Sequence, residues 1–200
     1  CPYCLSGIHR RATGGFVDCE RFERALDVMT KNHLLSSDGT IGLYNWGEPF
    51  LHPRLSELLL VLNERELSYG FSTNASRVPA IDQTFVRNRK FILFSMPGFS
   101  QRAYDRIHGF NFEQVLKNIQ SIVQTCREQG VRGLFTISYH VYQFNLEEIF
   151  RCEEFAARWD IAFSPVYAIL NNWWHINALV DSKLNYDLLR QISEDLFSLE

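Results

Sequence analysis

The chain has 200 residues, of which 46% are hydrophobic and 22% charged, and its formal net charge is −3. This composition is typical of a folded domain and excludes a disordered or low-complexity chain. The small negative charge provides no overall basic surface for nucleic acid, and no apolar run is long enough for a transmembrane helix. No secretory signal is visible, and five cysteines are too few for a disulfide scaffold, so we expect a reducing, cytoplasmic setting.

Apolar residues alternate along the chain between strand-like and helix-like spacing. Asp18 is the predicted N-cap of the first helix, and Gly130 is the predicted C′ residue of the longest one. Strands are predicted, in chain order, at residues 41–46, 67–72, 91–95, 134–139 and 161–166. Helices are predicted around residues 18–29, 53–62, 79–87, 112–129, 146–156 and 184–196.

This strand–helix alternation predicts parallel βα units in one α/β domain that covers residues 1–200. The continuous apolar character of residues 91–95 is typical of a strand that is buried on both faces. The domain is therefore either a doubly wound sheet or part of a (β/α) barrel. In both architectures the ligand site lies at the carboxyl ends of the strands.

Each predicted strand ends in polar or turn-forming residues, which ordinary turn chemistry alone would explain. Glu48 is the exception, because it lies between Gly47 and Pro49 directly after an apolar strand. A carboxylate at that position can point into the crevice and accept hydrogen bonds from an ammonium group. His140 follows another strand and is a candidate substrate contact, whereas the role of Trp173 and Trp174 stays open.

The chain begins with Cys1-Pro2-Tyr3-Cys4, a spacing that allows three interpretations. The first interpretation is two unrelated structural cysteines. The second is a glutaredoxin-like thiol–disulfide site, and the third is a pair of ligands for zinc or an iron–sulfur cluster. A glutaredoxin-like site needs a strand before the motif and a helix after it, and a loop-like stretch follows here. The other cysteines fall in helical patterns and are interpreted as structural thiols; they are Cys19, Cys126 and Cys152. No pair of histidines has the spacing of a zinc site.

Five segments in chain order resemble motifs of the radical S-adenosylmethionine (SAM) superfamily. Residues 1–4 resemble the last two cysteines of its CxxxCxxC motif, and Trp46-Gly47-Glu48-Pro49 resembles the GGEP motif of its second strand. Ser72-Thr73-Asn74 and Ser95-Met96-Pro97-Gly98 resemble the Thr-Asn-Gly and Ser-Leu-Asp-Gly segments of the next two strands, and residues 145–148 resemble the start of a later helix. The resemblance implies a partial (β/α)6-type TIM-like barrel without its first strand, with residues 171–200 as the start of a C-terminal extension.

The resemblance also implies a function. A [4Fe–4S] cluster would cleave SAM reductively to a 5′-deoxyadenosyl radical, which would abstract hydrogen from a substrate. The resemblance does not identify the substrate, which is a peptide or a small molecule. It favours an enzyme of peptide or cofactor maturation. An electron donor such as flavodoxin or ferredoxin and sensitivity to oxygen would follow.

Site residues carried over from the family are assigned position by position, and none is assigned as catalytic. Cys1 and Cys4 would be cluster thiolates, and Tyr3 would lie near the adenine. Gly47 and Glu48 would meet the methionyl ammonium group.

Two further positions, Thr73 and Ser95, would hydrogen-bond the methionyl carboxylate or the ribose. Trp46 would pack either beside the ligand or in the core.

This sequence departs from the family pattern at several positions. The first motif cysteine would lie four residues before Cys1, so we expect these 200 residues alone to be inactive. Trp46 and Ala75 replace glycines, and Pro97 stands where aspartate is common. Two other hypotheses stay open, namely a glutaredoxin-like oxidoreductase and a catalytically inactive barrel that serves as a binding module.

Overall fold

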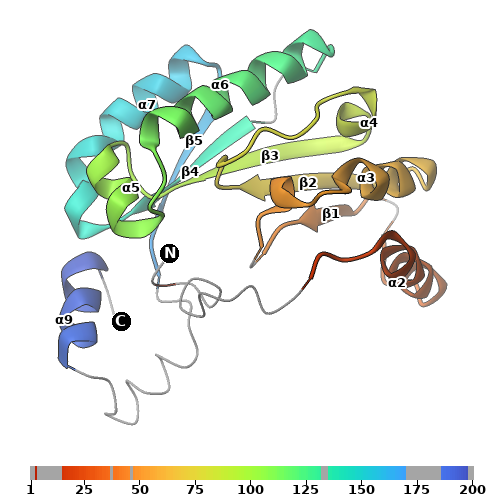
Figure 1. Ribbon diagram of the computed structural model, residues 1–200, viewed down its shortest axis with the longest axis horizontal. Coiled ribbons are helices and arrows are strands. Elements are labelled where there is room, and N and C mark those ends of the chain that lie inside the picture. The colour runs from red at the N-terminus through yellow and green to blue at the C-terminus, as the bar shows by residue number, and fades with distance from the viewer. Residues whose placement is uncertain are drawn as a thin grey trace.

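The structure is a computed structural model, which describes Tyr3 and residues 15–36, 38–45, 47–131, 135–169 and 186–197. Five strands form one sheet in which every described pair is parallel and the spatial order follows the chain order (Figure 1). The strands are β1 (Thr40–Leu43), β2 (Ser68–Thr73), β3 (Arg89–Met96), β4 (Phe135–Val141) and β5 (Ala162–Tyr167). The predicted α/β architecture with parallel strands is confirmed.

Helices connect the strands, and α6 and α7 lie along one face of the sheet (Figure 1). The α-helices are α2 (Cys19–Lys31), α3 (Leu55–Glu64), α4 (Gln83–Val86), α5 (Gln101–Ile107), α6 (Phe112–Glu128), α7 (Ile149–Arg158) and α9 (Tyr186–Asp195). Two 3₁₀ helices, η1 (Pro49–Leu51) and η2 (Gln143–Glu148), follow the carboxyl ends of β1 and β4.

The core lies between the sheet and the helices that cover it. Successive strand residues point to opposite faces, and on β3 every second residue from Ile92 to Met96 is buried in this core. Phe94 on β3 and its register partner Ile137 on β4 are both 0% exposed. On α6 the buried apolar residues recur with helical spacing and complete this layer; they are Val115, Ile119, Ile122, Val123 and Cys126.

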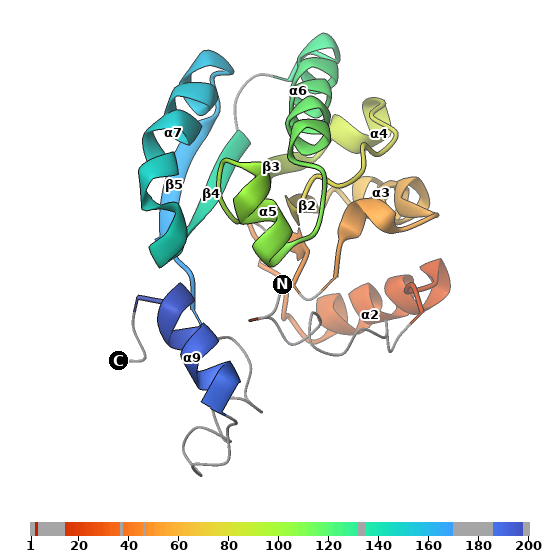
Figure 2. The same cartoon turned by 60° about the vertical axis from the view of Figure 1, so that its left-hand side comes forward.

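A second, smaller hydrophobic cluster joins α9 to the rest of the domain. Ile192 and Leu196 pack there with Tyr3, Ile107 and Tyr142. Figure 2 shows α9 beyond the carboxyl end of β5 and beside α5. The last helix is therefore packed against the same end of the sheet at which the candidate site lies.

Most predicted elements are confirmed, with shifted ends. Asp18 caps α2 by accepting a hydrogen bond from the backbone N–H of Arg21 at 2.8 Å. Gly130 follows α6 with φ of 84°, as expected of a C′ glycine. The strand predicted at residues 41–46 was too long, because β1 ends at Leu43 and Asn45 turns the chain with φ of 110°.

Several helices differ from their predicted extent. The helix predicted from Pro53 begins at Leu55, and the helix predicted at residues 79–87 is reduced to α4, which Asp82 caps. The short helices α5, η1 and η2 were not predicted, because they are too short to show an apolar period. In the described parts of the chain, no helix has the length and apolar character needed to cross a membrane.

Candidate functional site

Glu48 lies just beyond the carboxyl end of β1, where it caps the 3₁₀ helix η1. Its carboxylate accepts three hydrogen bonds. Oε1 accepts from the backbone N–H of Phe50 at 3.1 Å and from the hydroxyl of Thr73 at 2.7 Å, and Oε2 accepts from the backbone N–H of Asn74 at 2.7 Å. Two of these donors come from the end of β2, so one carboxylate fixes the ends of both strands.

The charge of Glu48 has no protein counter-charge among the described residues. Burial raises the pKa of its carboxyl above the usual value, and the hydrogen bonds from Asn74, Thr73 and Phe50 oppose that rise. Among the residues that the structure describes, no cation contributes to this balance. A half-buried carboxylate in such surroundings is chemically able to accept hydrogen bonds from a positively charged group.

Thr73 and Gly47 complete the surroundings of Glu48. Thr73 is 1% exposed, and its hydroxyl also accepts a hydrogen bond from the backbone N–H of Ala75 at 3.0 Å. Thr73 therefore holds the carboxylate, and its predicted contact with SAM stays a prediction. Gly47 is exposed, with open space where a Cβ would lie.

Ser95 lies on the face of the sheet opposite to the buried core. The strand register aligns it with Ser138 on β4 and, through Ser138, with Ser164 on β5. Parallel neighbours in register present their side chains to the same face, so three hydroxyls stand in one row near the carboxyl ends of the strands. His140 continues this face on β4, and burial lowers the pKa of its imidazole. The predicted roles of Ser95 and His140 as ligand contacts stay predictions.

The turn after β3 is fastened to the neighbouring turn after β4 by Glu148. This carboxylate is 4% exposed and accepts hydrogen bonds from the backbone N–H of Phe99 at 2.6 Å and the hydroxyl of Ser100 at 2.5 Å. Gly98 passes so close that a Cβ there would lie 2.9 Å from Glu148 Oε2 and 2.3 Å from the Cβ of Ala103. The sequence carries no signal for this contact beyond the resemblance of residues 145–148.

Asn145 reinforces the same junction and is 0% exposed. Its Nδ2 donates to the backbone carbonyls of Pro97 at 2.8 Å and His140 at 2.9 Å. Its Oδ1 accepts from the backbone N–H of Tyr142 at 2.8 Å. Buried amide groups need such partners. Because Asn145 bonds the chain after β3 and the end of β4, it holds these two segments at a fixed separation.

Tyr3 is 2% exposed, and its ring lies 6.0 Å from the ring of Tyr142. Its hydroxyl donates to Asp195 Oδ2 on α9. Burial, followed by the hydrogen bond to Asp195, raises the pKa of Tyr3, so the phenol stays a donor. The predicted contact of Tyr3 with adenine stays a prediction, and sequence reasoning did not anticipate its link to α9.

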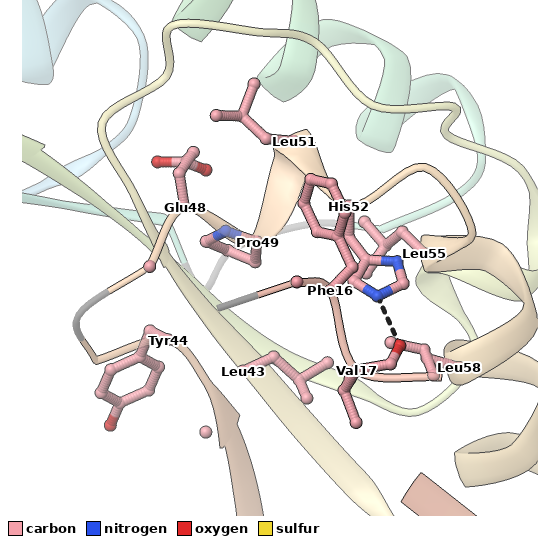
Figure 3. Close-up of a pocket in the computed structure, with 13 residues that line it drawn as sticks. Phe16, Val17, Leu43, Tyr44, Glu48, Pro49, Leu51, His52, Leu55 and Leu58 are labelled. Carbon is pink, nitrogen blue, oxygen red and sulfur yellow. Dashed lines mark hydrogen bonds between the residues drawn. The ribbon is translucent and has the colours of Figure 1, made fainter. Parts of the chain in front are cut away.

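An apolar pocket of about 570 Å³ opens beside β1 (Figure 3). Glu48 stands at one end of it and Leu58 at the other, with Leu43 between them. His52 borders the pocket, and its Nε2 lies 2.9 Å from the backbone carbonyl of Val17. The candidate site therefore combines one uncompensated carboxylate with adjoining apolar space.

Several predicted residues lie outside the described residues, namely Cys1, Cys4, Trp46, Trp173 and Trp174. Within the described part of the chain, no group of three or more histidine, cysteine or acidic side chains is arranged to hold a metal ion. The three cysteines interpreted as structural are free thiols there, with Cys126 and Cys152 both 0% exposed. Burial raises the pKa of Cys126 to about 11, which keeps that thiol protonated and inert.

Comparison with known proteins identifies similar folds. No protein-family profile and no curated protein matches the chain. Streptococcus suis SuiB bound to S-adenosylmethionine is 16% identical over 96% of this chain and 42% of that chain, with a TM-score of 0.59. SuiB bound to the precursor peptide SuiA is 16% identical over 98% of this chain and 44% of that chain, with a TM-score of 0.62. The chain thus shares the fold of SuiB and spans less than half of its length.

Proposed function

We propose that this chain is the core of a radical SAM enzyme. The observation that carries the proposal is the Glu48 carboxylate, which three donors orient at the carboxyl edge of the sheet without a described counter-cation. Two further findings support it. The motifs that resemble the superfamily occur in the expected order, and the fold is that of SuiB, which has been captured with SAM.

The residues at the strand ends fit the amino-acid part of SAM. An ammonium group beside Glu48 would neutralise the half-buried charge and use the acceptor capacity that the three protein donors leave. Gly47 presents backbone without a side chain next to it, and Ser95 offers a hydroxyl from β3. We therefore assign Gly47, Glu48 and Ser95 to SAM binding and Thr73 to the support of Glu48.

Cys1 and Cys4 are the proposed thiolate ligands of a [4Fe–4S] cluster. When bound, the cluster supplies the electron that cleaves SAM to methionine and a 5′-deoxyadenosyl radical. The protein's part is to orient SAM and to exclude water and oxygen from the site. The proposal also implies a one-electron donor, such as flavodoxin or ferredoxin, and a reducing, cytoplasmic setting.

A peptide is the substrate class that we favour. SuiB, with which this chain shares its fold, has been captured with a precursor peptide. The apolar pocket beside Glu48 gives room for uncharged side chains next to the proposed SAM site. No observation favours the glutaredoxin-like alternative, whose required strand and helix would flank residues outside the described part.

The decisive experiment is anaerobic reconstitution of the full-length protein with iron and sulfide, followed by SAM and dithionite. We expect a cluster with an iron–sulfur absorption spectrum and the release of 5′-deoxyadenosine, detected by chromatography. A reconstituted protein that binds SAM without forming 5′-deoxyadenosine would instead support the inactive binding module. A protein that neither assembles a cluster nor binds SAM would refute the proposal.

A further inference from the structure

The turn that follows β2 supplies two of the three donors that hold Glu48. Thr73 donates its hydroxyl to Oε1 at 2.7 Å, and Asn74 donates its backbone N–H to Oε2 at 2.7 Å. The next residue, Ala75, has a φ of 52° and is 1% exposed. This left-handed conformation is costly for a residue with a Cβ, and it persists only where surrounding contacts enforce it. The orientation of Glu48 therefore depends on the groups that hold Ala75.

Two hydrogen bonds hold the backbone of Ala75. Its N–H donates to the hydroxyl oxygen of Thr73 at 3.0 Å, while that hydroxyl donates its own proton to Glu48. Its carbonyl accepts from Nδ2 of Asn118 on α6 at 2.8 Å, across 43 positions of the sequence. A continuous series of hydrogen bonds thus leads from α6 through this turn to the carboxylate of the candidate site.

Asn118 is unlike its buried neighbours on α6. The other buried residues of this helix are apolar side chains and one thiol, whereas Asn118, at 8% exposure, carries an amide. A buried amide destabilises a protein unless its polar atoms are paired. Its Oδ1 accepts from Nε2 of Gln114 at 2.9 Å, so its Nδ2 is the atom directed at Ala75. The helix itself therefore fixes the orientation of this amide toward the turn.

We propose that Asn118 is a positioning residue that orients the Glu48 carboxylate through the left-handed turn at Ala75. Its purpose rests on the proposed function, in which Glu48 binds the ammonium group of SAM. Neither the sequence motifs nor the fold comparison assigns a role to this residue of α6.

The physical reason is the direction of the peptide group between Asn74 and Ala75. Without the bond from Asn118, the φ of Ala75 can relax to a negative value, and this rotation moves its N–H away from Thr73. The hydroxyl of Thr73 and the N–H of Asn74 then lose their alignment with Glu48. Hydrogen bonds to the ionised form lower the pKa of a carboxyl, so their loss raises the pKa of Glu48. No charged group among the described residues contributes to that pKa, so no ion pair masks the change.

The test measures the pKa of Glu48 in the metal-free full-length protein and in its Asn118→Ala variant, by carbon NMR of isotopically labelled glutamate carboxyl groups. The signal that disappears in Glu48→Gln identifies the residue. We expect the pKa of Glu48 to rise in Asn118→Ala. In reconstituted protein we expect the Kd for SAM to increase about threefold at neutral pH.

The matched control is Asn63→Ala. Asn63 is 2% exposed, and its Nδ2 donates to the backbone carbonyl of Thr84 at 2.7 Å, so this variant loses the same kind of buried hydrogen bond. Tyr69, near the start of β2, donates to the same carbonyl, which places the control at the other end of that strand. We expect the pKa of Glu48 and the Kd for SAM to stay unchanged in Asn63→Ala.

A second substitution tests the turn itself. Glycine adopts a positive φ without a steric penalty, so Ala75→Gly makes the turn less dependent on Asn118. We expect Asn118→Ala combined with Ala75→Gly to return the pKa of Glu48 close to its wild-type value. A contribution of Asn118 to stability alone would not produce this rescue, and a pKa that stays raised in the double variant overturns the inference.

Urea denaturation establishes that each variant is folded before its pKa is compared. If Asn118→Ala is unfolded, Asn118→Leu, which nearly keeps the side-chain volume, takes its place. An unchanged pKa of Glu48 after removal of the amide overturns the inference, and so does an equal rise in Asn63→Ala. A wild-type protein that does not bind SAM refutes the proposed function, while the pKa comparison still decides the role of Asn118.

Discussion

Two carboxylates at the same edge of the sheet, Glu48 and Glu148, are held in nearly the same way and face different surroundings. Each accepts one hydroxyl and one backbone N–H from the end of an adjacent strand, at distances from 2.5 to 2.7 Å. Glu148 is 4% exposed and lies 3.7 Å from a guanidinium nitrogen of Arg102. Glu48 is only half-buried and has no cation among the described residues.

This difference separates a structural carboxylate from a candidate ligand-binding one. Around Glu148 the hydrogen bonds, the cation and the backbone of Gly98 fill the available contacts, so the group fastens two turns together. Around Glu48 the same kind of hydrogen bonds orient a charge that has no cationic partner in the described part of the chain. Mutations at the two positions should therefore affect different quantities, namely stability at Glu148 and ligand affinity at Glu48.

Glu148→Ala is the change with the largest expected effect. It leaves the backbone N–H of Phe99 without its acceptor in a buried turn, and it removes the ion pair with Arg102. We expect a loss of about 3 kcal/mol in the free energy of unfolding, measured by urea denaturation of the metal-free protein. The control is the neighbouring Glu147→Ala, whose side chain is 79% exposed and whose loss should leave stability nearly unchanged. Equal effects at the two positions would contradict the assignment of Glu148.

Glu48→Gln should weaken SAM binding and leave the unfolding free energy close to that of the wild type. Removing one partner of a partly buried charge pair costs about 2 kcal/mol, which is about a 30-fold increase in Kd. Titration calorimetry with SAM, without turnover, measures the change. Glu57→Gln, an exposed carboxylate on α3, is the control with unchanged affinity. A Glu48→Gln protein that binds SAM as tightly as the wild type would refute the assignment of the ammonium contact.

The contrast between the two carboxylates also shows which parts of the fold and of the site could be predicted from the sequence. Periodicity was enough to predict all five strands and their parallel arrangement, and Glu48 was recognised because it directly follows an apolar strand. The role of Glu148 was not recognised, because its partners Phe99 and Ser100 lie 48 and more positions away and no local pattern encodes that contact.

Tyr3 shows a second limit of sequence reasoning. Its place in the motif implies a contact with adenine, which stays a prediction, and no sequence pattern indicates that its hydroxyl hydrogen-bonds Asp195, 192 positions away. Only tertiary packing brings these two residues together. Likewise, β1 ends early because Asn45 adopts a positive φ, which its position in an apolar run does not indicate.

The pH dependence of SAM affinity should distinguish Glu48 further. Burial raises the pKa of its carboxyl, and a bound ammonium group favours the ionised form and would lower it again. SAM affinity is therefore greatest above the pKa of the free protein and falls as the pH drops through it. We expect Kd to rise as the pH is lowered from neutral through the pKa of the Glu48 carboxyl. The Kd of Glu48→Gln should stay nearly constant over this range, and parallel profiles for the two proteins would contradict the prediction.

The smallest expected effect comes from the hydroxyl groups that hold the two carboxylates, Thr73 for Glu48 and Ser100 for Glu148. Thr73→Val removes one hydrogen bond to the ionised form of Glu48, so we expect about a fivefold increase in the Kd for SAM and a pH profile displaced to higher pH. Ser100→Ala removes the corresponding bond to Glu148 and also the cap of α5, since Ser100 accepts the N–H of Ala103 at 3.2 Å.

Ser100→Ala should therefore cost about 1 kcal/mol of unfolding free energy and leave Kd unchanged. Binding and denaturation measurements on both variants test this pair of outcomes together. If Thr73→Val lowers stability without weakening SAM binding, Thr73 serves the fold in the way Ser100 does. The proposed difference between the two carboxylates would then depend only on the result for Glu48→Gln.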